Sequence, residues 1–231
     1  MTPRKKFRLD TLFPTILLFA VSMPGNAYLI DNGVPDIGTS YVSDFDAGQQ
    51  VADNFTLTQD ANLTQIEWWG IYLYNNSPAT DSFTVRIFAD NGSGAPQITP
   101  TNLAGTLTRS GTGQTITVPV FFTSVTADIY HYTLDLGTAL NLTAGDYWLS
   151  IVNDTATDTN DNWYWLTSNA NSGNARSRPD DGTPWNTGLG NEMAFRISGT
   201  TVSPTPPGTV PEPAALSLLG LGLLLLRRHI S

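Results

Sequence analysis

The chain has 231 residues, a formal net charge of −9 at pH 7 and no cysteine. Disulfide bonds are therefore excluded, and a hydrophobic core must stabilise the fold. Between residues 28 and 209, five arginines and no lysine stand against 18 acidic residues, so this span disfavours nucleic acid and anionic lipid as partners.

The first 27 residues have the three-part layout of a signal peptide. A positively charged beginning precedes an apolar run from Leu12 to Val21, and small residues follow at 25–27. The apolar run is too short for a stable transmembrane helix. We therefore expect export, with cleavage after Ala27 and a mature chain that begins at Tyr28.

Residues 28–199 show the two-residue period that is typical of β-strands. Phe83, Val85 and Ile87, for example, alternate with polar residues, and Asn-Gly or Asp-Gly dipeptides mark turns between such runs. The predicted strands are Gln50–Leu57, Gln65–Tyr74, Ser82–Ala89, Leu103–Arg109, Thr115–Phe122, Ile129–Leu136, Tyr147–Asn153, Asn162–Ser168 and Glu192–Ser198. About nine short strands without helices predict an all-β fold, a single β-sandwich that is jelly-roll-like.

The sequence offers little for catalysis. His131 is the one histidine before the C-terminal tail, and it stands in a predicted strand where a sheet-surface position is the simplest interpretation. Glu67 and Glu192 could form the carboxylate pair of a glycosidase or lyase, but both belong to predicted strands. We expect no enzyme, and a carbohydrate-active enzyme stays the alternative.

An acidic stretch at 153–165 is a candidate calcium site. Asp154, Asp158, Asn160 and Asp161 offer the hard oxygen ligands that calcium prefers. An EF-hand is excluded because Trp163 stands where that loop needs glycine. The alternative is an acidic solvated loop built from Asx turns.

Three tryptophans lie in or beside the predicted loops. Trp163, Trp165 and Trp185 are flanked by Asp, Asn and Arg, the combination that stacks on a sugar ring and hydrogen-bonds its hydroxyl groups. Sandwich folds also bury tryptophan routinely, so a core role is the alternative for each of them. The functional interpretation is a binding site for polysaccharide.

The C-terminal part reads as a spacer and an anchor. Residues 200–209 are rich in Pro, Thr and Ser, which predicts an extended spacer. Residues 210–231 contain 13 uncharged residues, Ala214 to Leu226, followed by two arginines. A helix of this length covers only about 20 Å, but positive-inside anchoring by the arginines favours insertion in a membrane.

This tail resembles the PEP-CTERM sorting signal of exported bacterial proteins, also called the ice-binding protein C-terminal segment. The residues that carry the resemblance are Val210, Pro211, Glu212, Pro213, Arg227 and Arg228, with a Leu/Gly run between them. They cover about a tenth of the chain. The resemblance implies processing by an exosortase and attachment to the inner membrane through the C-terminal helix, before release to the cell surface.

Blocks in the domain, such as DNFTL at 53–57 and MAFRISG at 193–199, also resemble a jelly-roll type common ahead of such tails. That likeness concerns core strands and implies a fold alone. Three functions therefore compete: a cell-surface or matrix domain that binds exopolysaccharide, a secreted carbohydrate-active enzyme, and a structural envelope protein without a small ligand.

Overall fold

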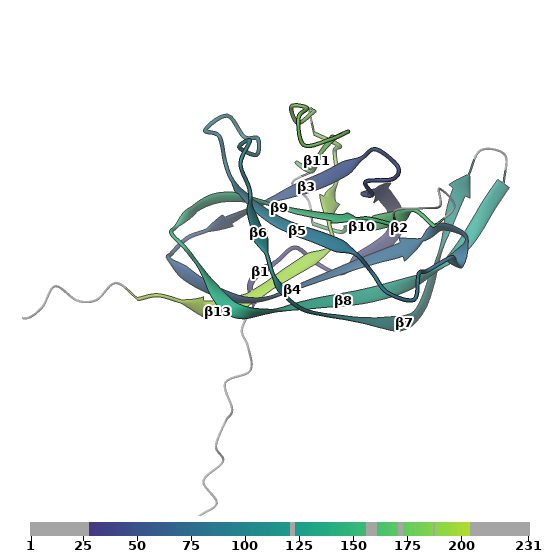
Figure 1. Cartoon of the computed structure of the whole chain (residues 1–231), viewed down its shortest axis with the longest axis horizontal. Coiled ribbons are helices and arrows are strands. Elements are labelled where there is room, and N and C mark those ends of the chain that lie inside the picture. The colour runs from purple at the N-terminus through teal and green to yellow at the C-terminus, as the bar shows by residue number, and fades with distance from the viewer. Residues whose placement is uncertain (1–27, 121–122, 156–160, 171–172, 187, 204–231) are drawn as a thin grey trace, which may run out of the picture.

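The computed structural model describes residues 28–120, 123–155, 161–170, 173–186 and 188–203. These residues form two antiparallel sheets packed face to face, a β-sandwich without an α-helix in the described part (Figure 1). The predicted signal peptide, residues 204–209 of the spacer, and the sorting segment with Val210–Pro213 and Arg227–Arg228 lie outside these residues. No helix long and apolar enough to cross a membrane occurs among the residues described.

The larger sheet, sheet A, has eight strands and is built around β4. The strand β4 pairs with β8 along one edge, and with β13 and then β10 along the other. The strands of sheet A are β1 (Tyr28–Asp31), β2 (Pro35–Val42), β4 (Ala61–Tyr72), β7 (Gly105–Val120), β8 (Thr123–Leu142), β10 (Trp163–Ser168), β12 (Glu192–Met193) and β13 (Phe195–Thr201).

The second sheet, sheet B, has five strands in the order β11-β3-β9-β5-β6. Its strands are β3 (Gln50–Leu57), β5 (Phe83–Ala89), β6 (Thr101–Leu103), β9 (Gly145–Asn153) and β11 (Arg176–Arg178). One short 3-10 helix, η1 (Leu73–Asn75), follows β4. Sheet B carries the cleft described in the next subsection.

Aromatic side chains fill the space between the sheets. Trp68 stacks on Tyr132 with ring centroids 5.5 Å apart, and Phe83 meets Trp163 edge to face at 4.9 Å. Trp163 and Trp165 are fully buried. Such pairs add to the large apolar area that each aromatic ring removes from water, so this cluster is a main source of stability.

Gly70 makes room for Trp163. It lies on β4, where a Cβ atom would stand 2.4 Å from three atoms of the Trp163 indole ring. Packed cores do not tolerate such an overlap without displacing the ring or the strand. Glycine is therefore required here by the tryptophan that covers it.

Replacing Gly70 with alanine is expected to lower the free energy of unfolding by about 2–3 kcal/mol because of this overlap. Urea unfolding followed by tryptophan fluorescence measures the loss. Gly137→Ala is the matched control, since nothing lies within 4 Å of its Cβ position, also on a sheet A strand. An equal effect of the two substitutions would contradict the packing argument.

The predicted strands occur, with corrections at their ends. The prediction of one strand at Leu103–Arg109 is wrong, because the chain leaves sheet B after β6 and enters sheet A with β7. The predicted Thr115–Phe122 strand continues β7 as far as Val120, and Phe121 and Phe122 lie outside the described residues. The predicted strand at Glu192–Ser198 is divided into β12 and β13.

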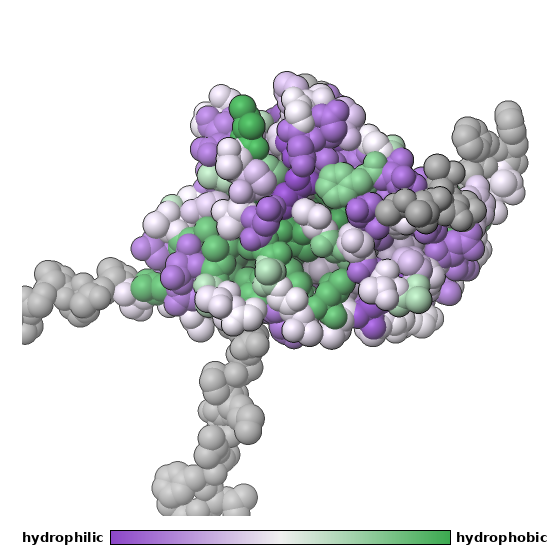
Figure 2. All heavy atoms as spheres, in the orientation of Figure 1, coloured by the Kyte–Doolittle hydropathy of each residue, from purple (hydrophilic) through white to green (hydrophobic). Residues whose placement is uncertain are grey.

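One edge of the sandwich shows apolar residues between the sheets. Figure 2 shows a hydrophobic area between the two layers on the side that carries β6. A groove of about 480 Å³ lies there, lined in part by Leu103, Leu136 and Leu140. It lies where the chain crosses from β6 to β7.

Candidate functional site

The outer face of sheet B carries rows of side chains set by its register. Asn54, Trp148 and Phe88 are direct neighbours across β3, β9 and β5. Residues two apart along a strand share a face, so Ala52 and Ser150 form the next row. These two side chains are small and fully buried, so the open part of the face lies on the Asn54 side of this row.

Two loops stand over this face. Residues 90–100 connect β5 to β6, and residues 173–186 include β11 and the turn after it; both stand on the outer side of sheet B (Figure 1). Trp185 from the second loop packs edge to face on Phe88, with ring centroids 5.7 Å apart. The loops therefore wall a cleft whose floor is the sheet.

We name this cleft the Trp148 cleft. It has a volume of about 560 Å³, which suits a few sugar rings. Its lining is Asn54, Asp90, Gly92, Ser93, Gly94, Asp146, Trp148, Asn174 and Arg176. The lining combines one indole with carboxylate, amide and guanidinium groups.

Asp90 is fixed at the rim of the cleft. Its carboxylate accepts a hydrogen bond from Trp148 Nε1 at 2.9 Å and others from the backbone N–H groups of Gly92 and Gly94 at 2.7 and 3.3 Å. Burial alone would raise the pKa of Asp90, but these hydrogen bonds outweigh burial and hold the pKa below its usual range. The rim is therefore negatively charged at neutral pH.

Two polar atoms in the cleft lining are left without a partner. Asn54 Oδ1 and Arg176 Nε are buried, and neither has a hydrogen-bond partner within the described part of the chain. The Arg176 guanidinium lies 5.5 Å from the Trp148 ring and donates to the carbonyl of Asn186 at 3.0 Å. Buried polar atoms are nearly always paired, so these two indicate a bound water or a ligand with hydroxyl groups.

A second hollow adjoins the loops and is named the Trp185 groove. It has a volume of about 300 Å³. Its lining is Asn91, Ala95, Pro96, Gln97, Ile98, Arg178, Asp181, Gly182, Thr183, Pro184 and Trp185. Ile98 is 87% exposed on the β5–β6 loop, and Arg178 lies 4.4 Å from the Trp185 ring centroid. The groove thus has an apolar side at Ile98 and a positively charged side at Arg178.

The structure separates the three tryptophans of the predicted sugar site. Trp163 and Trp165 point into the core on β10, and Trp165 Nε1 donates to the carbonyl of Ala194 at 3.0 Å. Neither ring presents a face to solvent, so the core alternative holds for both. Trp185 alone of the three is partly exposed, at the groove, and it packs beside Trp148 of β9, which is 3% exposed.

The predicted calcium ligands are only partly described. Asp158 and Asn160 lie outside the described residues, whereas Asp154 is exposed and Asp161 partly buried. Asp161 Oδ1 and Asn162 Oδ1 are buried without a hydrogen-bond partner in the described segments. No group of three or more acidic, His or Cys side chains in the described ranges could hold a metal ion. Calcium stays a prediction of the sequence.

The candidate catalytic carboxylates do not share a cleft. Glu67 lies on β4 and contacts His131 of the neighbouring strand β8. Glu67 Oε2 and His131 Nε2 are 3.1 Å apart, and the Trp69 ring stacks on the imidazole. Glu192 is buried and accepts a hydrogen bond from Asn32 at 2.9 Å. No cleft found among the described residues is lined by both glutamates.

Sequence patterns did not single out Asn54, Asp90, Asp146 or Arg176. These residues lie up to 122 positions apart and meet through the pairing of β3, β5, β9 and β11. The Asn91-Gly92 turn and the polar segment 176–185 were visible in the sequence. Neither signal shows which strand face lies beneath the loops.

Comparison with known proteins places the domain in a family. Residues 31–204 match the family model described as "Domain of unknown function (DUF7901)". No curated protein matches the chain. Because residues 31–204 make up about three quarters of the sequence, the chain belongs to this DUF7901 family.

Proposed function

We propose that this protein is an exported component of a bacterial cell envelope or extracellular matrix, and that its β-sandwich binds polysaccharide in the Trp148 cleft. The observation that carries the proposal is the pair of unpartnered polar atoms, Asn54 Oδ1 and Arg176 Nε, in a cleft floored by Trp148. An acceptor and a donor beside one another match the hydroxyl groups of a sugar, and the nearly buried Trp148 holds the Arg176 guanidinium in place beneath them.

The proposal of binding rather than hydrolysis rests on the state of the carboxylates in the cleft. Asp90 is occupied by Trp148 and two backbone N–H groups, and Asp146 accepts a hydrogen bond from Thr56 Oγ1 at 2.6 Å. A general acid needs a carboxyl group that keeps its proton near neutral pH, whereas the pKa of Asp90 is lowered. A glycosidase or lyase is therefore the weaker candidate.

Export and anchoring rest on the two ends of the chain. We propose that residues 1–27 act as a signal peptide and that residues 210–231 act as a PEP-CTERM-type signal for an exosortase. The predicted spacer begins later than expected, since Thr200 and Thr201 belong to β13, and residues 202–209 would then hold the domain away from the inner membrane. The net charge of residues 28–209 supports an exported, soluble domain with no nucleic-acid partner.

We also propose that the sandwich is a jelly roll. Its chain alternates between the sheets, from β3 in sheet B to β4 in sheet A, then to β5 and β6 in sheet B and to β7 and β8 in sheet A. The pairs β5–β6 and β7–β8 are hairpins, but other adjacent strands, such as β3 and β9 or β4 and β13, are distant in sequence, as in interlocked Greek keys.

Asn54→Ala and Arg176→Ala are each expected to weaken polysaccharide binding about five- to tenfold, since each removes one hydrogen bond to a sugar hydroxyl. Affinity electrophoresis of the full chain through gels with neutral and acidic polysaccharides finds the ligand, and calorimetry measures its Kd. A parallel series with calcium and with EDTA tests the predicted calcium site.

Asn141→Ala is the matched control, because Asn141 is exposed on β8 of sheet A and distant from sheet B. It should bind as the wild type does. If no polysaccharide retards the protein, binding in the Trp148 cleft is refuted. The same holds if all three variants bind with the affinity of the wild type.

A further inference from the structure

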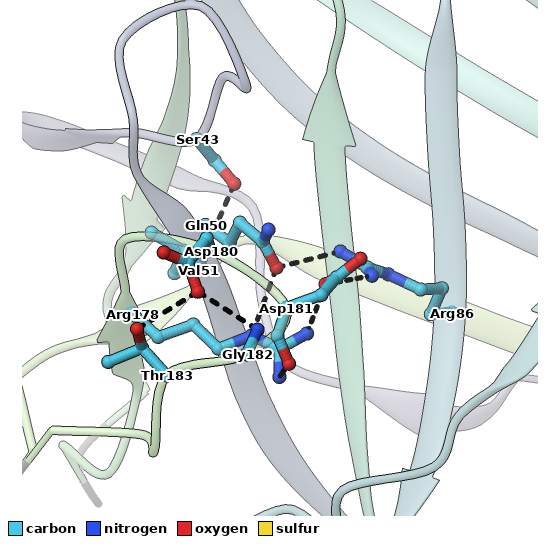
Figure 3. Close-up of polar contacts among 9 residues, drawn as sticks. All are labelled: Ser43, Gln50, Val51, Arg86, Arg178, Asp180, Asp181, Gly182 and Thr183. Carbon is cyan, nitrogen blue, oxygen red and sulfur yellow. Dashed lines mark hydrogen bonds and ion pairs between the residues drawn. The ribbon is translucent and has the colours of Figure 1, made fainter.

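Two buried arginines meet beside the Trp185 groove. The side chains of Arg86 and Arg178 are 4% and 3% exposed. Both guanidinium groups point at the same two oxygen atoms (Figure 3). Asp181 Oδ1 accepts from Arg86 at 2.6 Å and from Arg178 at 2.5 Å, and Gln50 Oε1 accepts from them at 2.9 and 3.0 Å.

Among the groups in direct hydrogen-bond contact, this cluster holds more positive than negative charge. Two guanidinium groups share one carboxylate, and Gln50 is neutral. The neighbouring Asp180 carboxylate is already taken by Gly182 N and Thr183 Oγ1, both at 2.9 Å. Burial lowers the pKa of Arg178; the charge of Asp181 opposes this effect, while Arg86 adds to it and Asp180 opposes it more weakly. The two buried guanidinium groups thus share one directly bound carboxylate, and Asp180 offsets the second positive charge only from a distance.

Asp181 can leave the arginines without disturbing the sheet. Its side chain is 63% exposed, and it belongs to the turn after β11 and not to a strand. Arg86 Nε, in contrast, is buried without a hydrogen-bond partner in the described part of the protein. A carboxylate that enters from the Trp185 groove, which Arg178 and Asp181 line, could replace or join that of Asp181.

We infer that Arg86 and Arg178 form a carboxylate subsite that Asp181 occupies in the free protein, and that the polysaccharide bound here contains uronic acid. The identity of the ligand rests on the proposed function. The chemistry of the subsite rests on the arginines, because guanidinium groups bind planar carboxylates through paired hydrogen bonds. Trp185, 4.4 Å from the Arg178 guanidinium, would stack on the sugar ring that carries the carboxylate.

The acidic domain does not exclude an acidic ligand. The net charge of residues 28–209 acts over long distances, and salt screens it beyond about 8 Å at physiological ionic strength. Three of the five arginines of this span, Arg86, Arg176 and Arg178, lie on β5 and β11 of sheet B. For an acidic ligand in contact with these arginines, the attraction to the nearby guanidinium groups outweighs the screened repulsion by the distant carboxylates.

The test compares oligogalacturonate with its methyl ester, which has the same sugar chain without charge, on the full-length protein in 0.15 M salt. The wild type should bind the acid about tenfold more tightly than the ester, as expected for one charged hydrogen-bonded pair. Asp181→Asn should bind the acid about tenfold more tightly than the wild type does, because the competing carboxylate is gone. Its affinity for the ester should equal that of the wild type. Arg178→Gln should bind acid and ester alike.

Arg196→Gln is the matched control, since Arg196 pairs with Asp31 on sheet A and should keep the preference for the acid. Equal binding of acid and ester by the wild type would overturn the inference, even where a neutral polysaccharide confirms the proposed function. An unchanged acid affinity in Asp181→Asn would overturn it as well.

A second measurement does not depend on polysaccharide binding. Free galacturonate, but not galactose, should raise the Tm of Asp181→Asn, because the anion binds the folded state alone. This result would support the subsite even where no polysaccharide is retained and the proposed function fails. An equal Tm in both sugars would overturn the subsite itself.

Discussion

Raising the pH from 4 to 8 is expected to lower the free energy of unfolding, chiefly through Asp53. This residue is fully buried on β3 and faces the space between the sheets, where it is hydrogen-bonded to Glu192 of β12. Asp53 Oδ2 also accepts from Asn32 at 3.0 Å and from the backbone N–H of Met193 at 2.6 Å. Two carboxyl groups thus join the two sheets in one dry contact.

The sign of the effect follows from the pKa of Asp53. Burial, and then the charge of Glu192, raise it well above the usual value of 3.8. A raised pKa means that the folded protein binds the proton more tightly than the unfolded chain does. The resulting stabilisation is fully present below pH 3.8, and it is lost as the pH rises through the folded-state pKa, at up to about 1.4 kcal/mol per pH unit. Burial also raises the pKa of Asp44, which acts in the same direction. Three carboxyl groups have a lowered pKa and change the free energy of unfolding only below about pH 4. They are Asp31, Asp90 and Asp181.

Asp53→Asn should remove most of this slope. The amide can still donate to Glu192 but puts an N–H group where one Asp53 oxygen accepts from Met193 or Asn54, so the variant should be about 1–2 kcal/mol less stable than the wild type at pH 4. The two stability curves should approach or cross by pH 8. Urea unfolding at each pH measures them.

Asp31→Asn is the control for that series, because its lowered pKa places its own effect below the pH range of the measurement. It should keep the slope of the wild type. A wild-type stability that is constant or rises between pH 4 and 8 would contradict the assignment to Asp53.

Alternation along the chain predicted most strands and the sandwich because one side of each strand faces a single core. Three of the strands it missed, namely β1, β2 and β11, lack that signal. The strand β2 contains Pro35, Asp36 and Gly38 and has no fully buried residue, while β1 and β11 have only four and three residues. Their pairing partners, and not their own composition, make them strands.

The candidate site was beyond local patterns for a related reason. Ala52 and Asn54 look like ordinary solvent-facing positions of β3 in sequence, yet a loop more than 100 residues later covers them. Only the register of β3 with β9 and β11 shows that Trp148 and Arg176 face the same hollow. Long-range pairing therefore decides which polar residues meet.

The tryptophans show the same limit most clearly. Trp163 follows an acidic stretch and looks like a loop aromatic, but β10 lies between β4 and β2 and turns its ring into the core. Trp163→Ala is expected to lower the free energy of unfolding by about 3–5 kcal/mol, because it empties the space between Phe83 and Tyr132. Trp185→Ala, in contrast, removes a partly exposed ring from the outer face of sheet B and should cost about 1 kcal/mol.

A double-mutant cycle with Gly70 tests whether Trp163 is packed as the structure shows. The overlap that makes Gly70→Ala destabilising is with the Trp163 indole alone, among the atoms nearest to the added methyl group. In the Trp163→Ala background that methyl group would enter the empty space and replace part of the lost contact. Gly70→Ala should then be neutral or stabilising, a coupling of about 2–3 kcal/mol between the two sites. Additive effects in urea unfolding would show that the Trp163 ring does not cover Gly70, and the aromatic residue would again be available to a ligand.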